Sequence, residues 1–228
     1  NSASDKNLCR VIDGKKDYIN RQQVELHYIS GHGNIGYGSA HNLILERLNS
    51  DFHLILNPDL IVDEESLVNA ITAIGSDANV VAISPYAENM SGEKQYLCKR
   101  YPSVITFFIR GFLFKPLKRY FSERLSSYEM RELSEKKDSN GIELISGCFM
   151  LLDTRAFKLV GGFCESYFLY FEDFDLSIRI RKHGEIVYSP KVRIKHAGGE
   201  ASKKGLGHIF MFVRSGVRFY STHGWRFL

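Results

Sequence analysis

The chain of 228 residues has few cysteines and no hydrophobic run long enough to cross a membrane. Its four cysteines, Cys9, Cys98, Cys148 and Cys164, are scattered without CxxC spacing, which disfavours a disulfide framework and a zinc site. No stretch reaches the roughly 18 apolar residues of a spanning helix, and no secretory signal peptide is recognised. We therefore expect a cytoplasmic protein with reduced thiols.

An excess of charge of one sign is also missing. Lysine and arginine number 30 against 26 aspartates and glutamates, so the net charge of +4 does not by itself indicate nucleic-acid binding. Hydrophobic residues make up 44% of the chain, which is enough for the core of one α/β domain. Such a domain usually opens with a buried strand, whereas NSASDKN is loop-forming, so we expect a first strand upstream of residue 1.

The most distinctive stretch is YFLYFEDFDLSIRIR, from Tyr167 to Arg181. Glu172, Asp173 and Asp175 lie in an aromatic and apolar run that favours burial. Carboxylates held together in a low-dielectric setting are costly unless they bind a cation, share a proton or face a ligand. The pattern turns helical after Asp173, so the acidic N-terminus of a buried helix is the structural alternative.

A glycine-rich loop precedes the first clear helix, which is expected over Ala40–Leu48 with Ser39 as its N-cap. The glycines of this loop are Gly31, Gly33, Gly36 and Gly38. Such a loop before a helix N-terminus can hold a phosphate or a nucleotide, and a tight structural turn explains it equally well. The spacing matches neither the P-loop nor the dinucleotide fingerprint.

The apolar run Phe52–Leu56 predicts a buried strand, which Pro58 ends because proline lacks the N–H that a sheet needs. Asn57 and Asp59 then offer two oxygen-bearing side chains at the carboxyl end of a strand expected to be parallel. This spacing suits a hard divalent cation, and an ordinary turn is the alternative.

Helices and strands alternate through the rest of the chain, which predicts a largely parallel sheet with helical crossovers. The expected elements are a helix over 64–74 and strands over 79–84, 142–153, 186–188 and 192–195. Gly147 interrupts one strand and allows a ligand or another backbone to come close. Pro190 separates the last two strands.

Two segments combine aromatic and basic residues: Ser103–Phe121 and a terminal helix expected over Gly207–Thr222. A basic aromatic helix can lie on an anionic bilayer, and a helix that covers the core is the alternative. Between them lies His196, and a lone histidine is more often structural than functional.

Five segments in this order resemble glycosyltransferase family 2, and within it the bacterial rhamnosyltransferase-like branch that makes cell-surface polysaccharide. They are GNIGYGSAHN, LILNPD, ISGCFMLL, GGFCESYFLYFEDFDLSIRIRKHG and VYSPKVRIKHAGGEAS. The resemblance covers about Asn1–Ser202. It implies a GT-A fold with a Rossmann-like, mostly parallel central sheet flanked by helices, an inverting mechanism, a nucleotide-sugar donor and a divalent cation, Mn²⁺ or Mg²⁺.

The resemblance also implies roles for individual residues. Asp59 would bind the cation that bridges the donor diphosphate, and Asn57 stands where the family often has a first aspartate. Glu172 and Asp173 match the family's acidic pair, in which Asp173 would be the general base that deprotonates the acceptor hydroxyl. His196 matches a histidine that can complete the metal site.

On the donor side, Asn34, Gly36 and Asn42 match the loop that lines the donor pocket, and Gly147 is a further candidate. Asn1–Asp5 resembles the end of a base-binding segment. Cys164 stands where the family usually has aspartate, although the next residue, Glu165, is retained.

We thus expect a single GT-A domain, with a nucleotide-sugar-binding half (1–85), a variable helical insert (86–141), an acceptor and catalytic half (142–204) and a C-terminal helix (205–228). The expected activity is transfer of L-rhamnose from dTDP-rhamnose to a lipid-linked saccharide, with peripheral contact to the inner membrane and no nucleic-acid partner. A UDP-sugar donor, a non-catalytic scaffold and a peripheral membrane-binding module are the alternatives.

Overall fold

The computed structural model describes residue 14 and residues 24–112, 119–198 and 205–228. The chain divides into two compact units, residues 1–36 and 37–228. The helices and strands of the described residues all belong to the second unit. Asn1–Asp5, with its predicted role in base binding, lies outside the described residues. No helix in the described parts of the chain has the length and apolar character needed to cross a bilayer.

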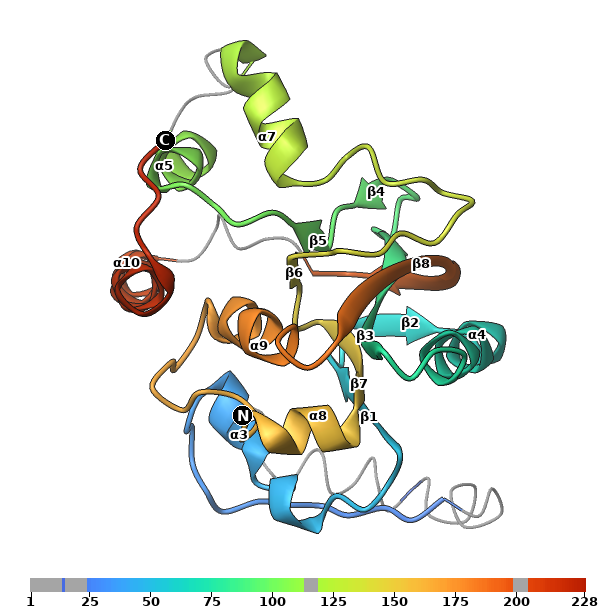
Figure 1. Cartoon of the computed structure of the whole chain (residues 1–228). Coiled ribbons are helices and arrows are strands. Elements are labelled where there is room, and N and C mark those ends of the chain that lie inside the picture. The colour runs from blue at the N-terminus through green and yellow to red at the C-terminus, as the bar shows by residue number, and fades with distance from the viewer. Residues whose placement is uncertain (1–13, 15–23, 113–118, 199–204) are drawn as a thin grey trace. The chain divides into compact units, whose positions relative to one another are not determined.

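The second unit is built on a six-stranded sheet in the order β1-β7-β3-β8-β2, with β4 paired to β3 at one end (Figure 1). Its strands are β1 (Phe52–Leu56), β2 (Leu60–Val62), β3 (Val80–Glu88), β4 (Lys94–Gln95), β7 (Phe149–Asp153) and β8 (Glu185–His196). Among the described strands only β3 and β8 pair in parallel, and the other pairings are antiparallel. The sheet is therefore mixed, where the sequence predicted a mostly parallel one, and β1 pairs antiparallel with β7.

The sheet is flanked by helices on both faces. Alternate residues of β7 point to opposite sides, as strand geometry requires. Phe149 and Leu151 belong to the core cluster under α4 (Glu64–Gly75), whereas Met150 and Leu152 belong to the cluster under α8 (Thr154–Leu159) and α9 (Glu172–Ile180). The strand predicted over 142–153 thus survives mainly as β7, which is buried on both faces.

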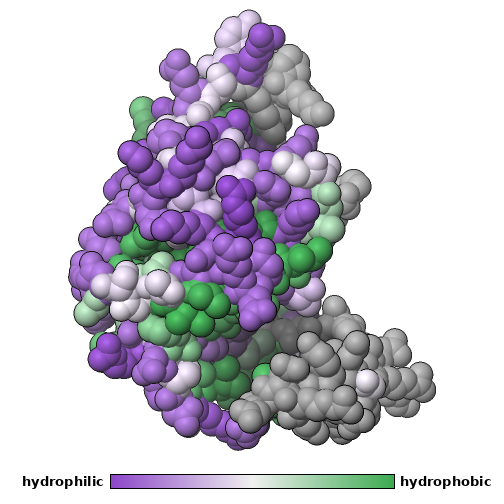
Figure 2. Space-filling view, turned by 90° about the vertical axis from the view of Figure 1, so that its right-hand side faces the viewer, coloured by the Kyte–Doolittle hydropathy of each residue, from purple (hydrophilic) through white to green (hydrophobic). Residues whose placement is uncertain are grey.

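The helix α4 forms where local signals place it. Asp63 is the N-cap, and its Oδ1 accepts a hydrogen bond of 2.7 Å from the backbone N–H of Ser66. Leu67, Val68 and Ile71 point outward and are exposed. Figure 2 views the side of the molecule that carries α4, where hydrophobic surface interrupts a mostly hydrophilic face.

The helix near Ser39 differs from the prediction. The structure has α3 (Tyr37–Asn42) followed by a short 3₁₀ helix, η1 (Leu45–Arg47), so Ser39 lies inside α3 and is not an N-cap. Tertiary contacts set this start: the Tyr37 N–H donates to Phe168 O at 3.0 Å. A side chain at Gly38 would come within 2.7 Å of Phe163 Cβ, so only glycine fits there.

A third layer contains the basic aromatic segments. It comprises α5 (Val104–Phe112), the 3₁₀ helix η2 (Arg119–Phe121), α7 (Ser122–Tyr128), α10 (Leu206–His223) and a two-stranded sheet of β5 (Cys98–Lys99) and β6 (Leu144–Ile145). Buried Phe171 and Phe219 are central to its aromatic cluster. The predicted terminal helix is confirmed as α10. One face of α10 covers this cluster and the other is exposed, and contact of the exposed face with a bilayer stays a prediction.

Candidate active site

The acidic pair lies directly after a strained turn. Tyr170 and Phe171 have φ of +71° and +65°, a left-handed conformation that bulky residues rarely adopt. The Phe171 ring is buried, with the rings of Phe107, Phe212 and Phe219 centred 5.1–5.2 Å away. Such turns cost about 1–3 kcal/mol per residue and persist where packing enforces them. Here the packing starts α9 at Glu172, so the acidic pair occupies its first turn.

Asp173 is held by backbone donors from two segments. Its Oδ2 accepts from Gly147 N at 2.9 Å, and its Oδ1 accepts from Phe174 N at 2.9 Å. A side chain at Gly147 would meet Asp173 Cβ and Tyr37 Cε1 at 3.3 Å each. The close approach predicted at Gly147 is therefore made by protein groups, and it fixes the carboxylate in one orientation.

Glu172 and Asp173 have perturbed acidities. Glu172 is 5% exposed, and its Oε2 is buried without a hydrogen-bond partner among the described residues. Burial and the neighbouring charge of Asp173 raise the pKa of Glu172 to about 8. Burial also raises the pKa of Asp173, although hydrogen bonds from Gly147 and Phe174 oppose this effect. The pair can therefore hold a proton at neutral pH, which suits acid–base chemistry.

Lys99 is a charged neighbour that the sequence analysis missed. It is 7% exposed, and burial lowers the pKa of its amine to about 8. Its positive charge lowers the pKa of Asp173 and so favours the carboxylate. A single lysine in a short strand carries no sequence signal for this role.

Tyr37 joins several of the predicted residues and was also missed. Its hydroxyl lies 2.6 Å from Gly147 O and 3.1 Å from Asn57 Oδ1. Burial and the charges of Asp173, Glu172 and Asp59 all raise its pKa, which keeps the phenol neutral. Asn57 at the end of β1 therefore contacts the hydroxyl directly, and Asp173 at the start of α9 is connected to it through Gly147. The segment GNIGYGSAHN contains this tyrosine, but its role depends on Gly147, which is 110 residues away along the chain.

Asp59 and His196 form a second part of the site. Pairing of β2 with β8 places Leu60 opposite His196, and Ala197 N donates to Asp59 O at 3.0 Å. His196 Nε2 consequently lies 3.5 Å from Asp59 Oδ2. The two residues that the sequence assigned to a metal are thus neighbours.

This arrangement fits a divalent cation. A side chain at Gly198 would come within 2.4 Å of His196 Nε2 and 2.8 Å of Asp59 Oδ2, so only glycine leaves these atoms uncovered. Imidazole nitrogen and carboxylate oxygen are common ligands of Mn²⁺. Within the described residues no group of three or more His, Cys, Asp or Glu side chains could hold a metal. The described residues thus bring one carboxylate and one imidazole together at this place.

The remaining residues that were predicted to bind the sugar donor separate into two groups. The Asn42 amide donates to Phe163 O at 2.9 Å and Glu165 Oε1 at 3.1 Å, and accepts from Phe163 N at 2.9 Å. Its polar atoms thus join α3 to the loop before α9, and its predicted contact with the sugar donor stays a prediction. Asn34 and Gly36 belong to the first unit, where Gly36 N donates to Asn34 Oδ1 at 3.3 Å, so their donor roles stay predictions.

The fold is the GT-A fold of glycosyltransferases, as the sequence predicted. The structure of GalNAc-T7 with UDP, GalNAc and Mn²⁺ aligns with a TM-score of 0.63 at 12% identity, over 92% of this chain and 39% of that one. The mannosyltransferase PcManGT from Pyrobaculum calidifontis, in complex with GDP-Man and Mn²⁺, aligns with a TM-score of 0.57 at 16% identity, over 95% and 53%. At these identities the likeness concerns the fold alone.

Curated relatives confirm the resemblance to rhamnosyltransferases. The chain is 27% identical over 175 residues to the N-acetylglucosaminyl-diphospho-decaprenol L-rhamnosyltransferase of Mycobacterium tuberculosis, covering 72% of this chain and 56% of that protein. It is 25% identical over 209 residues to rhamnosyltransferase WbbL of Escherichia coli, covering 86% and 75%. A low-salt glycan biosynthesis hexosyltransferase of Haloferax volcanii, Agl10, is 27% identical over 193 residues, covering 78% and 57%. The chain thus spans little more than half of the mycobacterial relative, and no family model matches it.

Proposed function

We propose that this chain is the catalytic region of an inverting glycosyltransferase that acts at the cytoplasmic face of a membrane. Its donor would be a nucleotide sugar, with dTDP-L-rhamnose as the first candidate, and its acceptor a lipid-linked saccharide. One observation carries the proposal: the Tyr37 hydroxyl lies 3.1 Å from Asn57 Oδ1 and 2.6 Å from Gly147 O. Asn57 precedes Asp59 by two residues and Gly147 N donates to Asp173, so the segments that carry the metal-ligand candidate and the base candidate meet at one hydroxyl. The names of the rhamnosyltransferase relatives support the choice of sugar and acceptor.

In this proposal Asp173 accepts the proton of the acceptor hydroxyl. Its two oxygens are anchored by Gly147 N and Phe174 N, so the carboxylate is fixed in one orientation before the acceptor binds. An inverting displacement needs this single base and no protein nucleophile. Glu172, protonated at neutral pH by the shift of its pKa to about 8, keeps a second negative charge away from Asp173.

Asp59 and His196 would hold the divalent cation together with the donor diphosphate. A cation at this position supplies positive charge to the leaving diphosphate. Asn57 and Gly147 border the same region through the Tyr37 hydroxyl and would contact the donor. Asn34 and Gly36 are proposed to line the donor pocket on the strength of the sequence pattern alone.

A binding experiment tests the donor and the metal together. Thermal stability would be measured with dTDP, UDP, GDP and their sugars, with and without Mn²⁺. Saturation by the right nucleotide at about 100 times its Kd should raise the Tm by about 5–10 °C, and only with Mn²⁺. A preference for UDP would indicate that the donor is a UDP-sugar and not dTDP-rhamnose. No response from the folded protein would favour the scaffold or membrane-binding alternative.

Two variants separate the proposed roles. Asp59→Ala should abolish Mn²⁺-dependent nucleotide binding, because it removes an anionic ligand of the cation. Asp173→Asn should leave that binding nearly unchanged and lower turnover by about 10²–10⁴, the range for loss of a general base. Full turnover in Asp173→Asn would show that another group is the base, and unchanged Mn²⁺ dependence in Asp59→Ala would contradict its metal role.

A further inference from the structure

Gln95, in β4, contacts His196 on the side away from Asp59. Its Oε1 lies 2.9 Å from His196 Nδ1. Its Nε2 donates to Gly198 O at 3.1 Å and to His196 O at 3.3 Å. The pairing of β4 with β3 sets Gln95 opposite Ala87, so the backbone that carries this amide is fixed by the sheet.

These contacts determine which nitrogen of His196 carries the proton. An amide NH₂ only donates and a carbonyl oxygen only accepts, so the carbonyls of His196 and Gly198 hold the Gln95 amide in one orientation. Its oxygen must then face Nδ1 as an acceptor, and Nδ1 must carry hydrogen. In the neutral ring, Nε2 is left with a lone pair, and this lone pair faces Asp59 Oδ2 at 3.5 Å.

We propose that Gln95 is a positioning residue that keeps His196 in the Nδ1–H tautomer, so that Nε2 and Asp59 can share a divalent cation. The inference rests on the proposed function for the identity of the site. The same amide holds the carbonyl of Gly198, the glycine that leaves the His196–Asp59 pair uncovered. Outer hydrogen bonds of this kind orient metal-binding histidines and fix their tautomer. The competing arrangement is a simple ion pair, in which Nε2 carries hydrogen toward Asp59.

Three variants of the full chain isolate this role. Gln95→Leu removes the acceptor for Nδ1–H, whereas Gln95→Glu keeps an acceptor, loses the two donor bonds to carbonyls and adds a negative charge. Glu93→Gln is the matched control, because Glu93 lies in the same hairpin and accepts from Asn89 instead of His196. Folding of each variant would be checked by its thermal unfolding.

The first readout is the ¹⁵N NMR spectrum of the His196 ring in mildly alkaline solution, which shows which ring nitrogen carries the proton. We expect the proton on Nδ1 in the wild-type protein, in Gln95→Glu and in Glu93→Gln, and a shift of the proton toward Nε2 in Gln95→Leu. A proton on Nε2 in the wild-type protein would overturn the inference.

The second readout is the affinity for Mn²⁺ alone, which a titration measures from the paramagnetic broadening of the His196 signals. Gln95→Leu should weaken Mn²⁺ binding about 10–100-fold, the usual cost of losing such a hydrogen bond, and Gln95→Glu, which keeps the acceptor, should weaken it less. Equal affinity in the wild-type protein and Gln95→Leu would also overturn the inference. Failure of every nucleotide to bind, with both readouts as expected, would instead contradict the proposed function.

Discussion

At Glu172, burial has a consequence for stability that can be measured. The pKa of this carboxyl is raised from an ordinary value near 4.5 to about 8 in the folded protein. The folded state therefore retains a proton that the unfolded chain has released. The stability from protonated Glu172 is complete below pH 4.5 and is lost as the pH rises to about 8.

The variant Glu172→Gln should not lose this stability as the pH rises, because its amide cannot ionise. Its free energy of unfolding relative to the wild-type protein should rise steadily between about pH 4.5 and pH 8, as measured by urea denaturation at several pH values. At pH 7 the wild-type side chain is largely protonated, so turnover of Glu172→Gln should stay within about tenfold of wild type. A constant stability difference across this range would show that Glu172 has an ordinary pKa.

The residues of the site differ in how far sequence could identify them. Asp59 and Asp173 are recognisable because each lies in a local pattern, a turn after a strand and an acidic helix start. Tyr37 and Gln95 are not, because their roles come from contacts 110 and 101 residues away along the chain. The contacts of Asn42 could not be predicted for the same reason, since its partners in the 163–165 segment are distant in sequence. A motif thus identifies groups that act on their own, whereas groups that hold others in place need the fold.

At the scale of elements, α9 is fastened to its neighbours through the buried carboxylate of Asp175. Its Oδ2 pairs with Arg179 at 2.7 Å, and its Oδ1 lies 2.8 Å from Nε2 of His223 in α10. Arg179 in turn donates to Val160 O and Gly162 O, at 2.7 and 2.9 Å. One carboxylate therefore links α9 to both α10 and the loop after α8.

Replacing Asp175 with alanine should cost about 3–5 kcal/mol of unfolding free energy, because it leaves the guanidinium of Arg179 buried without its counter-charge. Urea denaturation measures the loss. The matched control is Arg155→Gln, whose ion pair with Asp153 is on the surface and should be worth less than about 1 kcal/mol. Similar losses in both variants would contradict a structural role for the buried pair.

Element boundaries were predictable where local chemistry sets them. Strand β1 matches its apolar run, and α4 follows its Asp63 cap. Strand direction was not predictable, because nothing local indicates that β7 inserts between β1 and β3. Pro190 predicts two separate strands, yet β8 continues through this residue. The pairing of β8 with β3 shifts in register there: Pro85 lies opposite Ser189, and the next residue, Tyr86, lies opposite Arg193. Sheet context thus accommodates a residue that would end an isolated strand.

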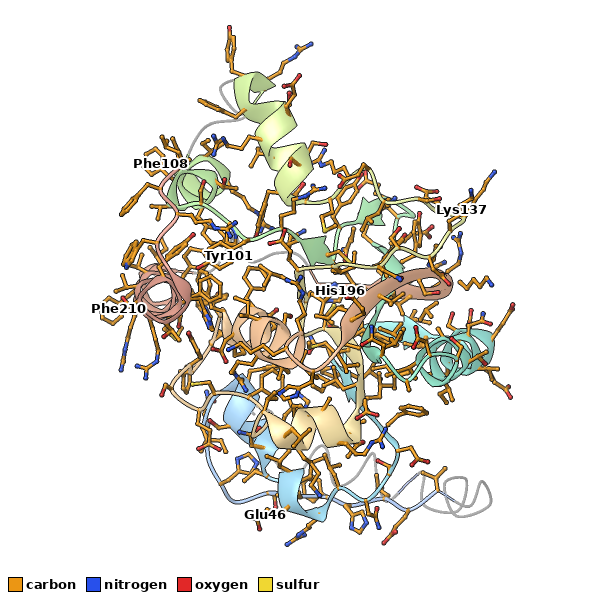
Figure 3. The ribbon with its side chains drawn as sticks, viewed as in Figure 1. Glu46, Tyr101, Phe108, Lys137, His196 and Phe210 are labelled. Carbon is orange, nitrogen blue, oxygen red and sulfur yellow. The ribbon has the colours of Figure 1, made fainter. Side chains whose placement is uncertain are left out.

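On the scale of the whole molecule, α10 and α4 each expose several apolar side chains, and the two helices differ in charge. On α10, the exposed residues are Ile209, Phe210, Val213 and Val217, with Arg214 and Arg218 also exposed. Figure 3 shows Phe210 directed away from the body of the second unit. On α4, Val68 and Ile71 are exposed, but the helix has two glutamates in its first turn and no basic residue. Between these two helices, α10 combines exposed apolar side chains with the positive charge that attracts anionic lipid.

The proposed lipid-linked acceptor therefore predicts that α10 rests on the bilayer. Flotation with vesicles containing anionic lipid should carry the wild-type protein upward, and added salt should weaken the effect. The double variant Phe210→Ser, Val213→Ser should bind at least about tenfold more weakly, because it removes more than about 1.4 kcal/mol of apolar burial. The α4 variant Val68→Ser, Ile71→Ser changes a similar apolar area and should float like the wild-type protein. Equal losses in both variants, or equal binding to neutral vesicles, would show that exposed apolar area alone drives the association and would remove the case for α10.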